Sequence, residues 1–228
     1  NVLKGGAGQV FEHRNRIDYY NECFVGRDKE GKEVIDWASS DNENNILPIY
    51  SQAGMGKGAL VADIITKLSD DHIPVLHHFC GSGLANNLHA IVYHLILQGK
   101  KMQLWKTDDE QMKKKIAKMP SKYTDVIMLL HSLIDECYTP TRKNTSGNMV
   151  IVIDGLDEAS VSFPEYNISD YFSNYDENGE VSDSWNSNNK IKWIFTYREG
   201  FYKFPNFDKH HSIESVHPLL GLDEESVA

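Results

Sequence analysis

A glycine-rich segment with a single lysine is the clearest chemical feature of this sequence. The segment reads Ser51-Gln52-Ala53-Gly54-Met55-Gly56-Lys57-Gly58, with Ala59 next; an apolar run at 46–50 precedes it and helical spacing follows. Glycine lets the backbone curl so that successive N–H groups face phosphate oxygens, and the N-terminus of a helix adds partial positive charge. Lys57 stands where it reaches the outer phosphates of a nucleotide. The segment therefore predicts a phosphate-binding loop.

This loop departs from the pattern G-x-x-x-x-G-K-[ST] at both ends. Ser51 replaces the first glycine, and Gly58 replaces the hydroxyl residue that usually ligates Mg²⁺. Ala59 has no hydroxyl either, so water would fill the vacant position at a loss of about 1–3 kcal/mol if the contact is not reproduced. We expect these changes to slow hydrolysis more than they weaken binding, and we expect Gly58→Ser to raise Mg²⁺-dependent hydrolysis.

Acidic residues follow the most apolar run of the chain. Residues 149–153 read Met-Val-Ile-Val-Ile and end in Asp154-Gly155-Leu156-Asp157-Glu158. Parallel sheets bind ligands at the carboxyl ends of their strands, so Asp154 is placed to hold Mg²⁺ directly or through water. Asp157 or Glu158 is placed to orient or deprotonate an attacking water. The alternative is an ordinary polar loop after a core strand.

An arginine follows another apolar run, at 193–196. Arg198 stands two residues beyond Thr196, and on the same sheet edge it would meet a terminal phosphate. The alternative is a surface arginine that pairs with Glu199.

The elements that must position these residues alternate along the chain. Strand-length apolar runs occupy 46–50, 75–79, 149–153 and 193–196. Apolar residues at helical spacing occupy 60–68, 88–96 and 126–134, and a glycine turn at 24–27 leads into a further helix. Alternating strands and helices predict an α/β fold, a three-layer sandwich with a mostly parallel central sheet.

The remaining segments suggest how the chain is organised. Residues 1–22 predict a linker from a preceding region, and 23–216 the nucleotide-binding domain. Residues 139–148 predict a loop, and the polar stretch 160–190 an irregular insertion. Residues 217–228 predict the start of a truncated helical lid domain.

Four motifs in order carry a family resemblance. They are Phe24-Val25-Gly26-Arg27, the phosphate loop, Asp154-Gly155-Leu156-Asp157-Glu158, and Thr196 with Arg198. This order resembles the STAND class of P-loop NTPases, of NACHT or close type, over roughly residues 24–220. The resemblance implies that Val25, Gly26 and Arg27 flank the adenine or ribose of ATP or ADP. It implies that Gly54 through Ala59 wrap the phosphates, and that Thr196 and Arg198 read the γ-phosphate.

The resemblance also implies a wider role. STAND proteins are signalling switches in which an effector usually precedes this module and a sensor follows it. Nucleotide state and sensor contact would control self-association, with innate immunity or antiphage defence as the setting. The expected partners are further copies of the chain and an unidentified sensor ligand, for example a protein.

Composition excludes several classes. The 228 residues carry a net charge of -10 and three cysteines, which argues against fibrous and disulfide-framework proteins and against a nucleic-acid surface. No apolar run approaches membrane-spanning length and no signal segment is visible, so we expect a cytoplasmic protein. The run Lys113-Lys114-Lys115 predicts a solvated helix face.

A histidine pair invites a metal interpretation that the spacing does not favour. His78 and Cys80 would share one face of a strand and His77 the other, and no second ligand pair lies at metal spacing. Buried or edge residues are the simpler interpretation.

Three hypotheses of function follow from the sequence. The first is a nucleotide module that binds ATP with Mg²⁺ and hydrolyses it slowly. The second is a scaffold that keeps nucleotide without hydrolysing it, because of Gly58. The third is a small-molecule phosphotransferase, suggested by the Lys-Gly pair.

Overall fold

The computed structural model of the chain describes residues 6–22, 24–40, 46–81, 87–117, 123–137, 147–161 and 191–200. Most of the expected loop at 139–148 and of the insertion at 160–190 lies outside these residues. The expected lid segment at 217–228 lies outside them entirely. Within the described part of the chain, no helix has both the length and the apolar character needed to cross a bilayer.

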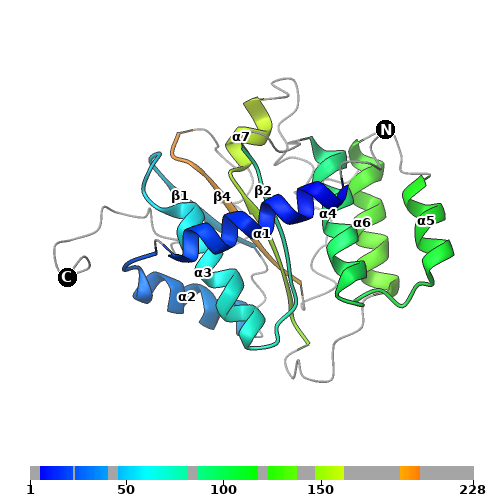
Figure 1. The fold of residues 1–228 in the computed structure, drawn as a ribbon, viewed down its shortest axis with the longest axis horizontal. Coiled ribbons are helices and arrows are strands. Elements are labelled where there is room, and N and C mark those ends of the chain that lie inside the picture. The colour runs from blue at the N-terminus through cyan, green and yellow to red at the C-terminus, as the bar shows by residue number, and fades with distance from the viewer. Residues whose placement is uncertain are drawn as a thin grey trace, which may run out of the picture.

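A parallel sheet forms the centre of the molecule (Figure 1). Its strands are β1 (Ile46–Ser51), β2 (Val75–Phe79), β3 (Met149–Asp154) and β4 (Ile191–Arg198). Their spatial order is β1-β4-β3-β2. All four predicted apolar runs are strands, and β3 is buried at every position, as a strand covered on both faces must be.

Helices cover both faces of the sheet and bury two apolar clusters. On one face, α2 (Asp28–Ser39) and α3 (Lys57–Asp70) pack over side chains such as Ile49, Val152 and Ile194. On the other face, α4 (Leu88–Lys101) and α6 (Tyr123–Cys137) pack over Ile151 and Phe195. The predicted α/β three-layer fold is confirmed.

Two short helices complete the described fold. The first, α5 (Asp109–Ala117), carries the lysine run, with Lys114 exposed to solvent. The second, α7 (Leu156–Val161), follows β3 directly and buries Leu156 and Ala159 in the cluster beneath α4 and α6. The sequence pattern predicted no helix at this point.

A helix also replaces most of the expected N-terminal linker. Residues 6–22 form α1 (Gly6–Glu22), which crosses in front of the sheet from α3 towards α4 (Figure 1). Ile17 and Tyr20 pack against the cluster beneath α3, and the side-chain amide of Asn21 donates to Thr66 Oγ1 at 2.8 Å. The linker prediction was wrong here because tertiary contacts, several of them through polar or aromatic side chains, outweigh weak apolar periodicity.

Side chains from α1 and α4 cover the outer edge of β2. Gln98 Nε2 donates to the carbonyl of His77 at 2.5 Å, and its Oε1 accepts from the N–H of the same residue at 3.0 Å. His13 Nδ1 accepts from the N–H of Phe79 at 3.1 Å, and Arg16 Nη1 donates to the carbonyl of Cys80 at 2.9 Å. Because β2 ends the described sheet, these three side chains, here called the edge cover, pair backbone groups that would otherwise be open.

Candidate functional site

The carboxyl ends of the four strands meet at one edge of the sheet, and the predicted site residues gather there. Ser51 at the end of β1 lies opposite Arg198 at the end of β4, and Phe79 lies opposite Asp154 at the end of β3. Because β4 lies between β1 and β3, Thr196 and Arg198 stand between the phosphate loop and the acidic strand end.

The phosphate loop turns between β1 and α3 with no side chain above Gly54 and Gly56. Gly54 and Gly56 adopt φ values of 79° and 83°, which strain any residue with a Cβ. Among the described residues, no atom lies within 4 Å of where a Cβ on either glycine would stand. Gly56 also begins α3 without a side-chain cap, so the first-turn N–H groups of the helix suit an anion.

Lys57 and Ser51 are held together at the mouth of this loop. The Lys57 ammonium donates to Ser51 O and Ser51 Oγ, both at 3.0 Å, and to Gln52 O at 2.9 Å. Ser51 is in a strand and is not among the residues with positive φ, so the position does not require the glycine of the usual pattern. Burial lowers the pKa of Lys57, whereas the nearby charges of Asp157 and Asp154 raise it.

Asp154 and Thr196 form a hydrogen-bonded pair below the loop. Thr196 Oγ1 donates to Asp154 Oδ1 at 2.6 Å and accepts from the N–H of Gly155 at 2.8 Å. Burial raises the pKa of Asp154, and the hydrogen bond from Thr196 opposes that rise. The Thr196 hydroxyl, expected to read a γ-phosphate, therefore orients the buried carboxylate in this state.

Arg198 joins the two further acids at the start of α7. Its Nε lies 3.2 Å from Asp157 Oδ2, and its Nη2 lies 3.1 Å from Glu158 Oε1. Its backbone N–H also donates to Asp157 Oδ1 at 3.2 Å. The sequence left open a pairing with Glu199; the described contacts of Arg198 are instead with the two acids predicted for catalysis.

The turn before α2 reaches the phosphate loop through one residue. Gly26 and Arg27 both have positive φ, 77° and 65°, which is uncommon for arginine. The buried Arg27 guanidinium donates to Met55 O at 3.3 Å and to Glu30 Oε1 at 2.9 Å, while Val25 is 59% exposed. Arg27 thus supports the loop backbone, and Val25 presents apolar surface to solvent.

Two residues of α1 that were not among the predicted site residues approach the site. A Cβ built on Gly58 would lie 3.1 Å from Cε2, Cζ and Oη of Tyr20. The guanidinium of Arg16 is close enough to lower the pKa of Asp154. A predicted linker offered no reason to place either residue here. The signal in the sequence that could have indicated a helix here is the spacing of Arg16 and Tyr20 with His13 and Ile17, which places them on one helix face.

The residues present fit the phosphates of a nucleotide with Mg²⁺. Backbone N–H groups at an open helix N-terminus and one lysine suit phosphate oxygens. A buried carboxylate supplies the oxygen donor that Mg²⁺ prefers, and the metal usually keeps several waters besides. Asp154 is therefore the residue of this edge best placed to hold the metal.

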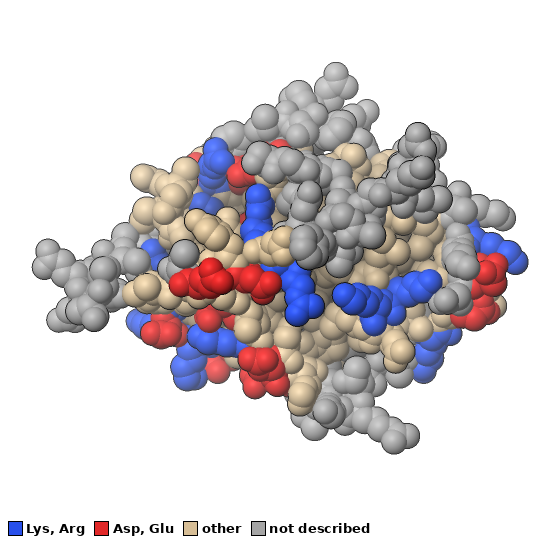
Figure 2. Space-filling view, viewed as in Figure 1, with Lys and Arg blue, Asp and Glu red and all other residues tan. Residues whose placement is uncertain are grey.

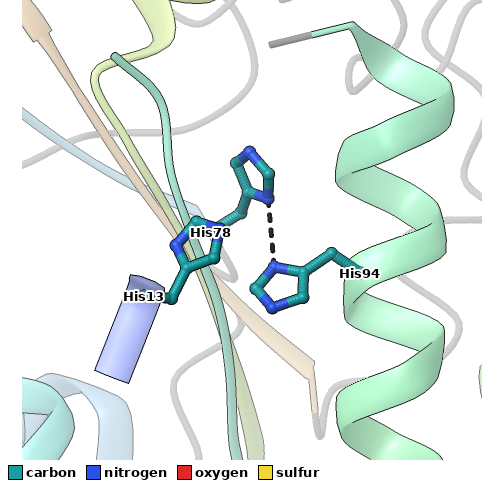
Figure 3. Close-up of side chains that lie close together, drawn as sticks. All are labelled: His13, His78 and His94. Atoms are coloured by element: carbon teal, nitrogen blue, oxygen red, sulfur yellow. Dashed lines mark hydrogen bonds between the residues drawn. The ribbon is translucent and has the colours of Figure 1, made fainter. Parts of the chain in front are cut away.

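A histidine cluster lies apart from this edge, between α1, β2 and α4 (Figure 3). His13, His78 and His94 are buried, and one nitrogen of each lies within 4.8 Å of the others. The rings of His13 and His94 stack at 4.1 Å with 22° between their planes, so their lone pairs lie in nearly parallel planes. His13 Nδ1 already accepts from Phe79, and His78 Nδ1 lies 3.1 Å from His94 Nδ1. The three histidines therefore suit packing beside the edge cover better than they suit binding a metal ion, which needs ligands that converge on one point.

The surface drawn in Figure 2 mixes charges of both signs. Lysine and arginine side chains lie beside aspartate and glutamate on the left of this face, and further basic side chains lie across its middle.

Comparisons with known proteins give one family and several remote structures. The profile described as "Nephrocystin 3, N-terminal" matches residues 29–198, a range that includes the phosphate loop and the acidic strand end. No curated protein matches the chain.

Two solved structures illustrate the remote similarity. A Walker-type ATPase of Pyrococcus abyssi is 13% identical, with a TM-score of 0.47 over 77% of this chain and 46% of that chain. The ORC2 protein of Aeropyrum pernix, in ADPNP and ADP complexes, is 14% identical, with a TM-score of 0.46 over 78% and 44%. The chain thus spans less than half the length of each.

Proposed function

Since the chain belongs to the Nephrocystin 3, N-terminal family, we propose that its loop-bearing sheet edge binds ATP or ADP with Mg²⁺ and hydrolyses ATP slowly. One observation carries this proposal: the phosphate loop, Asp154, Thr196 and Arg198 meet at the carboxyl edge of one parallel sheet. No other described part of the chain combines an open anion-binding loop with a buried carboxylate.

Binding begins with the loop and its lysine. Lys57 exchanges its bonds to Ser51 and Gln52 for the outer phosphates, while the first-turn N–H groups of α3 receive the inner oxygens. Val25 offers apolar surface for the adenine, and Gly26 lets the backbone approach the ribose. Arg27 acts through Met55 by keeping the loop in shape.

Hydrolysis then depends on the acids and Arg198. Mg²⁺, when bound, neutralises phosphate charge, and Asp154 is the residue that would hold it. Both carboxylate oxygens of Asp157 contact Arg198, whereas Glu158 contacts it through Oε1 and its side chain is 39% exposed. Glu158 is therefore the acid better placed to orient a water, and Arg198 would turn from these acids to the γ-phosphate.

The slow rate follows from two features of the resting site. Position 58 offers no hydroxyl as a direct metal ligand, and Arg198 is engaged by the acids that would otherwise act on water. The same two features favour the second candidate, a scaffold that keeps its nucleotide without hydrolysis. The wider role of a STAND-type signalling switch that self-associates, in immunity or antiphage defence, rests on the family resemblance in the sequence.

The test compares Lys57→Ala with Lys67→Ala, a matched change at the opposite end of the same helix, where Lys67 pairs with Asp63 at 2.8 Å. Calorimetry with ATP and ADP, with Mg²⁺ present, should show binding to the wild type and to Lys67→Ala. Affinity should fall at least about tenfold in Lys57→Ala, since a charge-assisted contact to phosphate is lost.

A phosphate-release assay on the same proteins separates the two candidate functions. Release that depends on Lys57 supports a slow ATPase, and binding with a melting shift but no release supports the scaffold. Absence of nucleotide binding in the wild type, or an unchanged Lys57→Ala variant, would overturn the proposal.

A further inference from the structure

Gly58 is unlike the other two glycines of the phosphate loop. Gly54 and Gly56 have positive φ and open space around them, so backbone conformation explains both. Gly58 is not among the positive-φ residues, so its backbone accepts any side chain. A Cβ there would instead press on the ring of Tyr20, 3.1 Å from Cε2, Cζ and Oη. A side chain at position 58 would therefore require the Tyr20 ring to shift by a few tenths of an ångström.

The Tyr20 ring is fixed in this space by the packing of α1. Asn21, its neighbour in sequence, donates to Thr66 on α3, and Ile17 one turn earlier packs with Tyr20 against the apolar cluster. The ring of Phe79 lies 6.4 Å from the Tyr20 ring, centroid to centroid. Contacts with α3 and with β2 therefore hold the Tyr20 phenol beside the start of α3.

We propose that the Tyr20 hydroxyl replaces the hydroxyl that phosphate loops ordinarily carry after their lysine. This inference rests on the proposed nucleotide function of the same edge. Serine or threonine at position 58 would extend an oxygen from its Cβ, and Tyr20 Oη lies 3.1 Å from that Cβ position. The hydroxyl arrives from a different element, 38 positions earlier in the chain.

The surroundings of the phenol suit this task. Burial raises the pKa of Tyr20, the charges of Asp154 and Glu158 raise it further, and Arg16 opposes them. Tyr20 therefore keeps its proton and can both donate and accept a hydrogen bond, as serine and threonine do. Because Mg²⁺ usually keeps several waters, a hydroxyl that binds a metal-bound water serves in place of a direct ligand.

The alternative is that Tyr20 only fills space beside Gly58. Phenylalanine preserves the ring and removes the hydroxyl, so Tyr20→Phe separates the two roles. Tyr19→Phe is the matched control, because Tyr19 is the adjacent residue of α1 and is 63% exposed. Thermal unfolding of both variants checks that α1 stays packed.

The decisive measurement is ADP affinity by calorimetry, once with Mg²⁺ and once with EDTA. In the wild type and in Tyr19→Phe, Mg²⁺ should increase affinity. In Tyr20→Phe the affinity in EDTA should stay within about twofold of the wild type, while the increase due to Mg²⁺ should shrink about tenfold. An undiminished Mg²⁺ effect in Tyr20→Phe would overturn the proposal and leave the proposed function intact.

A second pair of variants tests the same hydroxyl from the other side. Gly58→Ser alone should reduce the affinity for ADP, because its Cβ meets the Tyr20 ring. We therefore expect Gly58→Ser to raise hydrolysis only where the Tyr20 side chain is shortened as well. In Tyr20→Ala, added Gly58→Ser should restore the Mg²⁺ effect that Tyr20→Ala loses. Failure of this rescue would contradict the proposal, whereas a wild type that binds no nucleotide would overturn the proposed function first.

Discussion

The motifs did not reveal that three predicted nucleotide contacts, Thr196, Arg198 and Arg27, also bond to other residues of the site. Each is a predicted nucleotide contact, and each is bonded to another part of the site: Thr196 to Asp154, Arg198 to Asp157 and Glu158, and Arg27 to Met55. Thr196 and Arg27 are buried, and the exposed Arg198 partners the buried Asp157. A polar group buried without a partner would destabilise the fold, so these contacts hold the site together before a ligand arrives. The same residues are then available to exchange protein partners for phosphate oxygens.

Thr196→Val tests this property at a single side chain. Valine keeps the branched shape but leaves Asp154 Oδ1 and the N–H of Gly155 without their hydroxyl partner. We expect the free energy of unfolding to fall by about 1–3 kcal/mol and Mg²⁺-dependent nucleotide binding to weaken. Urea unfolding and calorimetry measure the two effects.

Thr196→Ser is the control for this change, since it retains the hydroxyl and removes one methyl group. It should recover most of the Mg²⁺-dependent binding. If serine, which keeps the hydroxyl, weakens binding as much as valine does, the Thr196 hydroxyl is not the group that supports Mg²⁺-dependent binding.

At the level of elements, β2 depends on neighbours that are not strands. The described sheet ends at β2, and the edge cover of His13, Arg16 and Gln98 bonds its outer backbone groups. The side-chain amide of Gln98 donates to the carbonyl of His77 and accepts from its N–H, as the backbone of a further strand would. An uncovered parallel edge would be a template for association with other chains.

Gln98→Met tests the edge cover at its strongest point. Methionine has a similar length but offers no strong donor or acceptor, so the N–H and carbonyl of His77 lose their partners. We expect the free energy of unfolding to fall by about 2–3 kcal/mol and self-association at high concentration to increase. Chemical unfolding and light scattering measure these changes.

Gln111→Met on α5 makes the same substitution at an exposed position and should leave both measurements unchanged. Equal stability of Gln98→Met and the wild type would show that water satisfies the β2 edge as well as Gln98 does.

Across the whole molecule, the sequence predicted the sheet far better than the structure around it. Strands buried on both faces are nearly continuous apolar runs, so β1 to β4 were visible directly. Helix α1 was missed because His13, Arg16 and Tyr20, rather than an aliphatic stripe, make many of its contacts. The loop and the acids were predictable from motifs, whereas the place of Tyr20 beside Gly58 depends on tertiary packing across the chain.

The buried histidines give the molecule a predictable response to acid. Burial lowers the pKa of His94 to about 4 and that of His77 to about 3, and it lowers the pKa of His13 as well. The charged or titratable groups around them are one another, His78 and Arg16. In the unfolded chain histidine titrates near pH 6.5, so only the unfolded state takes up these protons between about pH 6.5 and 4.

Stability should therefore be fully present above about pH 6.5 and fall with acid at about 1.4 kcal/mol per pH unit for each such histidine. Urea unfolding at several values between pH 7.5 and 4.5 measures this slope. His94→Gln should make the slope shallower, and the exposed His72→Asn should not. A slope that His94→Gln leaves unchanged would assign the acid sensitivity to other groups.

One consequence follows from the course of α1. His13 closes the edge of β2, and two turns later Tyr20 stands against the phosphate loop, so one helix takes part in both places. Any ligand that favours the seated position of Tyr20 must, by thermodynamic reciprocity, also favour the closed edge of the sheet. Ligand binding at the phosphate loop would then increase together with coverage of the β2 edge, whose backbone groups would otherwise pair with another chain. On the proposed function, a nucleotide site built this way would report its state at the β2 edge of the sheet.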